Sequence, residues 1–148
     1  MPDRKGAGVT APALRFFADR SLGSQVVPTA LRAAGWMLET MDERYGIAAS
    51  QSIKDIQWIE EAAERGDVML CKDLRVAANP LEADVVHRVS ARVFGLARRD
   101  IDGPTMARCF LENEQRIFRM ARRAEGPYVV SVSMTGLRRV PLNLPRLT

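Results

Sequence analysis

Short apolar runs alternate with longer amphipathic segments along most of this chain. The short runs predict five strands, and the longer segments, whose apolar residues recur every three or four positions, predict four helices between them. The strands are expected near residues 16–18, 37–41, 68–72, 91–97 and 128–133, and the helices near residues 24–35, 52–66, 81–89 and 104–120. This alternation is typical of a three-layer α/β/α fold with a mostly parallel sheet of about five strands.

Residues with helix-capping and helix-ending preferences mark the expected boundaries. Ser24 is suited to cap the first helix, and Gly35 is suited to end it. Ser52 stands three residues before Asp55, which is the spacing of a capping box and predicts the start of the second helix. Residues 42–51 are largely polar and predict a connecting loop before that helix.

The composition fits one globular domain. The chain has 148 residues, of which 47% are hydrophobic and 27% are charged, enough for a sizeable apolar core. We expect the domain to span residues 14–140, with an N-terminal tail at 1–13 and a C-terminal tail at 141–148. No apolar run reaches the roughly 18 residues of a membrane span, and no signal peptide is evident, so a cytoplasmic protein is expected. Cys71 and Cys109 are expected to be buried, reduced thiols.

Positive charge exceeds negative charge by a modest amount. The formal net charge is +4, and the arginines that supply most of the positive charge are spread over the chain. Such an excess suits a protein that meets a polyanion, although it is weak support when taken alone. Arg108, Arg116, Arg119 and Arg123 fall mostly on one helix face, where Glu112 is spaced to pair with the first two, so a solvated, ion-paired face is expected.

Acidic residues stand where several expected strands end. Asp19 and Asp73 close the first and third strands, and Asp55 begins the helix that leads into the third strand. Because parallel strands end at the same edge of a sheet, these carboxylates are expected to converge there. Neighbouring carboxylates repel one another and are stabilised by a hard divalent cation such as Mg²⁺ or Mn²⁺. Such an ion acidifies water and neutralises charge on phosphate oxygens, which predicts phosphodiester hydrolysis.

The identity of a fourth acid is open at the level of sequence. Asp42, at the end of the second strand, is slightly favoured over Asp100 and Asp102, which follow the fourth strand. Asp42 also suits a turn, and Asp55 also suits the positive end of a helix dipole, so each has a purely structural interpretation.

Cations flank these acids and the ends of the same strands. They are candidates to bind substrate phosphates, and they also balance the local negative charge. The four candidates are Arg20, Lys72, Arg75 and Arg98.

Three segments resemble PIN-like ribonucleases. They are FFADRSL, which holds Asp19, SIKDIQWIEEA, which holds Asp55, and VMLCKDLRV, which holds Asp73. The resemblance is closest to the VapC-type toxins of bacterial toxin–antitoxin pairs and covers about residues 15–132. It implies an endoribonuclease in which Asp19, Asp55 and Asp73 bind Mg²⁺ or Mn²⁺, and which is held inactive by a cognate antitoxin and commonly forms a homodimer. The family often has a second acid at the position of Arg75, so the number of metal ions is open.

Other α/β classes lack their motifs in this chain. A phosphorelay receiver needs an acidic pair, a hydroxyl and a lysine after its first, fourth and fifth strands, and none of the three is present. Neither a G-x-G-x-x-G pattern nor a P-loop follows any expected strand. The remaining alternative is a catalytically inactive PIN-like protein that acts by binding RNA or a partner protein.

Overall fold

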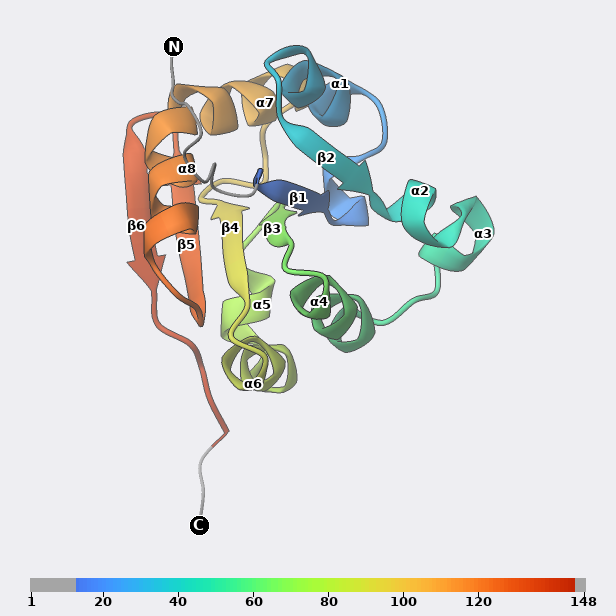
Figure 1. Cartoon of the computed structure of the whole chain (residues 1–148), viewed down its shortest axis with the longest axis vertical. Helices are drawn as coiled ribbons and strands as arrows, with labels where there is room; N and C mark the ends of the chain where they lie inside the picture. Colours follow the sequence, from blue (N-terminus) through green and yellow to red (C-terminus); the bar gives the residue numbers. More distant parts are fainter. Residues whose placement is uncertain (1–12, 146–148) are drawn as a thin grey trace, which may run out of the picture.

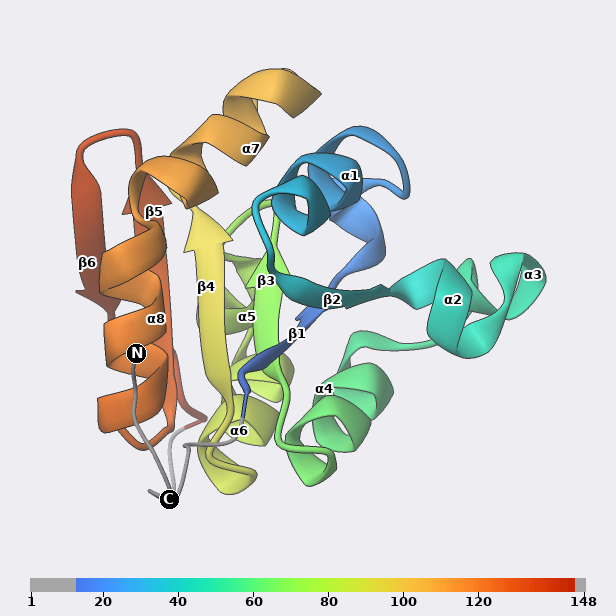
Figure 2. The same cartoon turned by 45° about the horizontal axis from the view of Figure 1, so that its top comes forward.

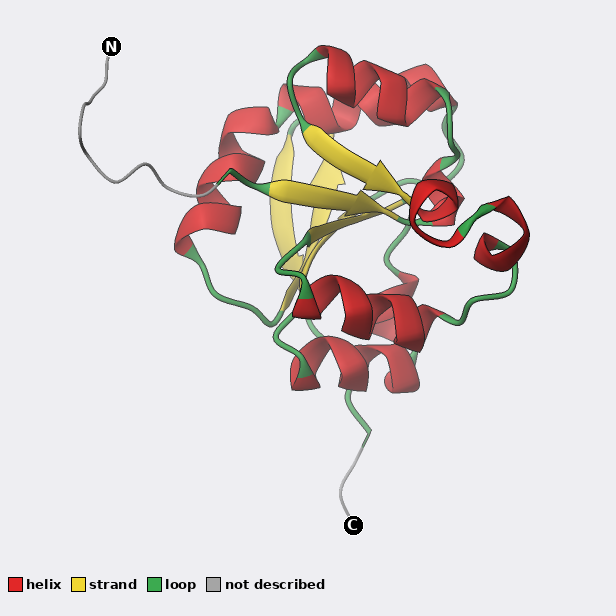
Figure 3. Ribbon diagram, turned by 45° about the vertical axis from the view of Figure 1, so that its right-hand side comes forward, coloured by secondary structure: helices red, strands yellow, loops and turns green. Residues whose placement is uncertain are grey.

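A six-stranded sheet lies between two layers of helices (Figures 1 and 3), in a computed structural model that describes residues 13–145. The strand order is β2-β1-β3-β4-β5-β6, in which the first five strands are parallel and β6 is antiparallel to β5. The strands are β1 (Arg15–Ala18), β2 (Met37–Thr40), β3 (Val68–Cys71), β4 (Arg92–Leu96), β5 (Tyr128–Ser133) and β6 (Gly136–Val140). The expected three-layer α/β/α fold is confirmed.

Each face of the sheet has its own helices and its own apolar core. One layer consists of α1 (Val26–Ala33), α7 (Gly103–Glu112) and α8 (Glu114–Arg123), and the other of α4 (Asp55–Glu64), α5 (Arg75–Ala78) and α6 (Pro80–Arg88). Because side chains alternate along a strand, Phe16 packs into the first core and Phe17 into the second. In the described part of the chain, no helix is long and apolar enough to cross a membrane.

The segment 42–51 is helical rather than a loop. It forms α2 (Met41–Tyr45) and α3 (Ile47–Ser50), which project beyond the β2 edge of the sheet (Figures 1 and 2). Thr40 caps α2 through a capping box: the Glu43 N–H donates to Thr40 Oγ1 at 3.2 Å, and the Thr40 N–H donates to Glu43 Oε1 at 2.9 Å. The Thr-x-x-Glu spacing at Thr40 and Glu43 indicates a helix start, and here it outweighs the polar composition that predicted a loop.

Two expected helix caps are wrong. Helix α1 begins after Gln25 rather than Ser24. Helix α4 begins at Asp55 with Lys54 at the capping position, while the Ser52 hydroxyl donates to the Ala49 carbonyl at 3.3 Å. Ser52 thus completes the end of α3 instead of starting α4.

The expected long helix over residues 104–120 is two helices that meet at Asn113. This side chain is buried, and its amide nitrogen donates to the carbonyls of Cys109 at 2.8 Å and Ser133 at 2.7 Å. The bond to Ser133 attaches the junction of α7 and α8 to the end of β5. A short polar side chain that bonds to nearby carbonyls competes with helix continuation, which explains the break.

The C-terminal part of the chain is more ordered than expected. β6 was missed because its sequence, Gly-Leu-Arg-Arg-Val, lacks an alternating apolar pattern, as an edge strand tolerates. Beyond it, Asn143 donates from its backbone N–H to Ala77 and from its side chain to Ala78, both at 2.8 Å. Residues 141–145 are therefore attached to α5, whereas residues 146–148 and most of the expected N-terminal tail, residues 1–12, lie outside the described structure.

Arg44 joins α2 to the rest of the fold. Its guanidinium lies 2.6 Å from Glu39 Oε1 and 2.7 Å from Asp67 Oδ2, and it stacks 4.1 Å above the Phe17 ring. The side chains of Arg44 and Asp67 are only 5% and 3% exposed. Asp67 is a buried carboxylate just before β3, and Arg44 is the cation that neutralises it.

Replacing Arg44 with Ala should lower the free energy of unfolding by about 3–5 kcal/mol, because Asp67 would remain buried without its main cation. The matched control is Arg88→Ala, which removes a guanidinium from exposed pairs with Glu60 and Asp84. An exposed pair of this kind contributes less than about 1 kcal/mol. Urea unfolding of both variants measures the difference, and equal losses would contradict the role assigned to Arg44.

Candidate active site

Asp19 and Asp73 meet because β1 and β3 are parallel neighbours. Ala18 is aligned with Leu70, and the backbone N–H of Asp19 donates to the Leu70 carbonyl at 2.9 Å. Asp73 follows two residues after Cys71, the last residue of β3. Both carboxylates therefore lie at the carboxyl edge of the sheet, as expected from the sequence.

Ser21 fixes the position of the Asp19 carboxylate. Its hydroxyl donates to Asp19 Oδ2 at 2.8 Å and accepts the backbone N–H of Lys72 at 3.2 Å. This pair of bonds connects the turn after β1 to the segment after β3. Ser21 thus limits the rotation of Asp19 and ties it to the loop that carries Asp73.

The Asp73 turn depends on a glycine in the neighbouring strand. Asp73 Oδ1 accepts the backbone N–H of Arg75 at 3.0 Å, which shapes the turn into α5. On β4, Gly95 packs so closely that a Cβ atom there would lie 2.3 Å from the Asp73 carbonyl oxygen. Only glycine allows this approach of β4 to the turn without a shift of the backbone.

Asp55 is held at the first turn of α4 by a buried tryptophan. The Trp58 indole N–H donates to Asp55 Oδ1 at 2.8 Å, and the Trp58 side chain is fully buried. The carboxylate accepts no capping bond from the helix backbone in the described structure. Trp58 is therefore both a core residue and the group that orients Asp55.

A fourth acid, Glu82, joins these three. Burial, and then the negative charges of Asp19, Asp73, Asp55 and Glu82 in that order, raise the pKa of the Cys71 thiol well above its usual value. All four carboxylates are thus near enough to Cys71 to affect its thiol, and we call Asp19, Asp55, Asp73 and Glu82 the four-acid site. Sequence reasoning missed Glu82, although an acid in the first turn of a helix that follows a parallel strand is a usable signal for this edge.

The environment of Glu82 disfavours its charged form. Burial, followed by the charge of Asp55, raises the pKa of Glu82 to about 7, while Arg75 opposes the shift. Glu82 therefore carries a proton in part of the molecules near neutral pH.

Asp19 is also in an environment that disfavours its charge. Burial raises its pKa, the hydrogen bond from Ser21 opposes this effect, and the charge of Asp55 adds to the increase. In addition, Glu82 Oε1 is buried and has no hydrogen-bond donor in the described structure. An unpartnered carboxylate oxygen among other carboxylates has the donor chemistry that a hard divalent cation requires.

The four-acid site is not a preformed metal cage. Among residues 13–145, no three Asp, Glu, His or Cys side chains form a ready metal-binding group. A cation that binds here would have to draw the carboxylates together. Since Ser21 and Trp58 hold Asp19 and Asp55 in place, Glu82, whose Oε1 has no hydrogen-bond partner in the described structure, is the acid with most freedom to move.

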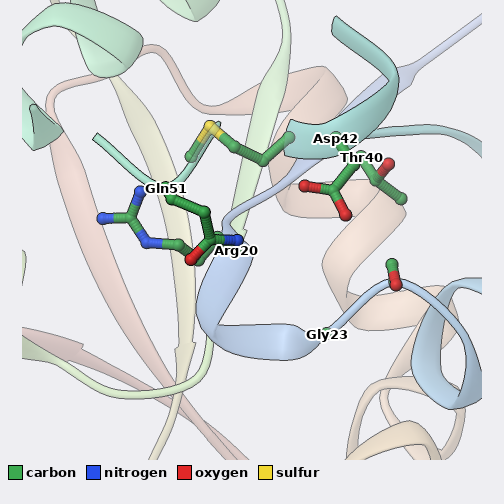
Figure 4. Close-up of a pocket in the computed structure, with 7 residues that line it drawn as sticks. Arg20, Gly23, Thr40, Asp42 and Gln51 are labelled. Carbon is green, nitrogen blue, oxygen red and sulfur yellow. The ribbon is translucent and has the colours of Figure 1, made fainter. Parts of the chain in front are cut away.

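The structure does not bring Asp42 into the four-acid site. Its Oδ1 accepts a hydrogen bond from Ser50, and its side chain lines a pocket of about 170 Å³ with Arg20 and Gln51 (Figure 4). Asp42 does not contribute to the raised pKa of Asp19, Cys71 or Glu82. We therefore include Glu82 in the four-acid site, while a role for Asp42 as a metal ligand stays a prediction.

The acids after β4 have other partners. Asp100 pairs with Arg98 at 3.1 Å, where both side chains are 70% exposed. Asp102 caps α7 by accepting the N–H of Thr105 at 2.9 Å. Neither acid contributes to the raised pKa values at the four-acid site.

Three of the four candidate substrate cations lie beside the site. The charge of Arg20 lowers the pKa of Asp19, and that of Arg75 lowers the pKa of Glu82. Lys72 is half-buried and follows Cys71 directly. Arg98, in contrast, is engaged by Asp100 on the surface.

Comparisons with known proteins agree with this geometry. Residues 14–98, more than half of the chain, match the family model for the PIN like domain. A Mycobacterium tuberculosis (strain ATCC 25618 / H37Rv) protein named "Putative ribonuclease VapC45" is 37% identical over 140 residues, which cover 95% of this chain and 99% of that protein. No solved structure matches the chain at a significant level. The fold, the matched residues and this relative together show that the chain belongs to the PIN-like domain family, with a VapC-type protein among its relatives.

Proposed function

We propose that this protein is a metal-dependent endoribonuclease and the toxin of a toxin–antitoxin pair. The observation that carries the proposal is that the parallel pairing of β1 with β3 sets Asp19 and Asp73 at one edge of the sheet, with Asp55 and Glu82 in the first turns of α4 and α6. The relative in M. tuberculosis, which aligns over nearly the full length of both proteins, bears a ribonuclease and VapC name. That likeness supports RNA as the substrate.

The four-acid site fits Mg²⁺ or Mn²⁺, because its donors are carboxylate oxygens and one of them is buried without a partner. When bound, such an ion supplies Lewis-acid chemistry: it acidifies water and neutralises negative charge that builds on phosphate oxygens. Asp19, Asp55, Asp73 and Glu82 would hold it. Arg20, Lys72 and Arg75 are placed beside these acids to bind the phosphates of the RNA strand.

The raised pKa of Glu82 has a consequence for cation binding. Because that pKa is about 7, a cation that used Glu82 as a ligand would displace the proton that Glu82 partly retains near neutral pH. Ser21 and Trp58 keep Asp19 and Asp55 oriented while this occurs. Cation affinity is therefore expected to increase as the pH rises through neutrality.

Three further properties belong to the same proposal. The VapC name of the relative supports a cognate antitoxin that inhibits this protein. Family resemblance supports a homodimer. A cytoplasmic location is consistent with an RNA substrate. The purified protein should thus cleave RNA when it is free of antitoxin, and added antitoxin should inhibit this cleavage.

Asp19→Asn, Asp73→Asn and Glu82→Gln should each lower RNA cleavage with Mn²⁺ by about 100-fold or more, since each removes a charged metal ligand. The assay is cleavage of a mixed RNA pool by purified protein, with EDTA as a parallel arm. Asp84→Asn is the matched control, because Asp84 lies on the same helix as Glu82 but pairs with the exposed Arg88. The proposal fails if the folded wild-type protein does not cleave, or if the site variants cleave as well as the control.

Glu82→Gln should raise the melting temperature in EDTA at pH 8, because it removes a half-buried charge that Asp55 repels. Each 1 kcal/mol of added stability corresponds to about 3 °C. The pKa of Glu82 rises from about 4.3 in the unfolded chain to about 7 in the fold. The stability that belongs to the protonated form is therefore fully present below pH 4.3 and is lost as the pH rises to 7. The gain of the variant over wild type should be absent near pH 4 and complete above pH 7.

Added Mn²⁺ should reverse this order at pH 8. A ligand that binds only the folded state raises its stability, so wild type should gain melting temperature and Glu82→Gln should gain much less. Differential scanning fluorimetry with and without Mn²⁺ measures both effects. A variant that gains nothing in EDTA, or responds to Mn²⁺ like wild type, would argue against a role for Glu82 at the site.

A further inference from the structure

The positive charge of this protein is concentrated in one part of the chain. Residues 103–140 contain seven arginines and three acids, an excess of four that equals the formal net charge of the whole chain. The remaining residues carry equal numbers of basic and acidic side chains. The excess is therefore not spread widely, as the sequence first suggested, but belongs to α7, α8, β5 and β6.

Four of these arginines form one surface. Helix α8 buries Ile117 and Ala121 and exposes a row of guanidiniums on the opposite side. We call this row the α8 arginine face, and it consists of Arg116, Arg119, Arg122 and Arg123. With a rise of 1.5 Å per residue, the row extends about 10 Å along the helix axis.

The α8 arginine face has no acidic partner within residues 13–145. The expected pairing of Glu112 with Arg108 and Arg116 does not form there. Elsewhere in the described structure, exposed arginines do find acids: Arg32 lies 2.5 Å from Glu43, and Arg88 lies 3.3 Å from Glu60. The α8 arginine face is therefore free of ion pairs in the described structure, and its four guanidiniums outnumber Glu112, Glu114 and Glu125, which line the hollows beside it.

The surface beside these arginines is hollowed along the helix. Three adjoining hollows have volumes of about 400, 350 and 400 Å³. Gln115 and Glu114 line both the first and the second, and Arg122 and Arg123 line both the second and the third. The shared residues make them one shallow groove that follows α8.

An aromatic ring and a strand arginine complete this surface. Phe118 is half-buried in the groove, and the Arg122 guanidinium lies 5.5 Å from its centroid. Arg139 of β6 is aligned with Val130, which faces the same core as α8, and its guanidinium lies 5.2 Å from the Tyr128 ring. Figure 1 shows β6 beside β5 and α8. Arg139 thus extends the positively charged surface from α8 to this edge strand.

The chemistry of the groove favours a nucleic acid backbone over a protein. Protein interfaces have apolar anchors at their centre, yet none of the exposed large apolar residues of the described structure lies on α8. Guanidiniums in a row bind successive phosphates. The Phe118 ring packs against Phe16 and Trp36 and supports Arg122 in this row. The phosphate backbone of single-stranded or folded RNA matches such a row.

We propose that the α8 arginine face is a second RNA-binding surface, separate from the four-acid site. This inference rests on the proposed function for its choice of RNA as the polyanion. Helix α8 covers the face of the sheet opposite to α4 and α6, which carry Asp55 and Glu82 (Figure 2). An RNA must therefore extend around the domain to touch both surfaces, so long or folded RNAs are favoured over short oligonucleotides.

The test measures RNA binding without cleavage. Fluorescence anisotropy with a labelled mixed-sequence RNA of about 40 nucleotides is performed in EDTA on wild type and on Arg119→Gln/Arg123→Gln, over a range of salt concentrations. Loss of two phosphate contacts should raise Kd about tenfold and reduce the slope of log Kd against log salt by about 1.4. Arg119→Lys/Arg123→Lys keeps both charges and should retain most of the slope.

Arg32→Gln/Arg88→Gln is the matched control, since it removes the same charge from two exposed but ion-paired arginines. It should change Kd less than about twofold. Equal weakening by both double variants, or unchanged binding by Arg119→Gln/Arg123→Gln, would overturn the inference and leave the face available to an acidic protein. Because binding is measured in EDTA, the expected difference in a protein without ribonuclease activity would support this surface while refuting the proposed function.

Discussion

The parallel pairing of β1 with β3 is the constraint on which the proposed chemistry depends. It aligns Ala18 with Leu70 and sets the turns that follow both strands side by side, so that Asp19 and Asp73 share one edge of the sheet. Helix α4 before β3 and helix α6 after it add Asp55 and Glu82 from their first turns. Asp19 and Asp73, more than fifty positions apart, thus become neighbours through the backbone hydrogen bonds between β1 and β3.

Two acids on opposite sides of β3 in the chain, the buried Asp67 and the half-buried Glu82, show how differently the fold treats negative charge. Asp67, before the strand, is neutralised by Arg44 and serves stability. Glu82, beyond the strand, has a buried oxygen without a donor and lies against Asp55, so it carries an electrostatic cost in the folded state. A bound ligand can offset such a cost. A carboxylate that a protein cation neutralises is typical of a structural role, and a carboxylate without such a partner is typical of a functional site.

Sequence patterns predicted what depends on local signals. Apolar runs located the five parallel strands, and strand-end acids identified Asp19 and Asp73. Glu82 was missed because its neighbours in the site come from three other segments and only the folded chain brings them to it. The break at Asn113 depends on a hydrogen bond to Ser133 twenty residues away, so helical periodicity alone could not reveal it. Likewise, helical spacing predicted that Glu112 pairs with Arg108 and Arg116, and spacing alone could not reveal that these pairs do not form within residues 13–145.

Manganese binding, followed by electron paramagnetic resonance of free Mn²⁺ at pH 8, tests most directly whether the four-acid site is the metal centre. Wild type and Asp42→Asn should bind Mn²⁺ with the same affinity, because Asp42 bonds to Ser50 outside the four-acid site. Glu82→Gln should weaken binding by about tenfold or more. Loss of binding in Asp42→Asn with wild-type affinity in Glu82→Gln would contradict the account and assign the fourth ligand to the other acid.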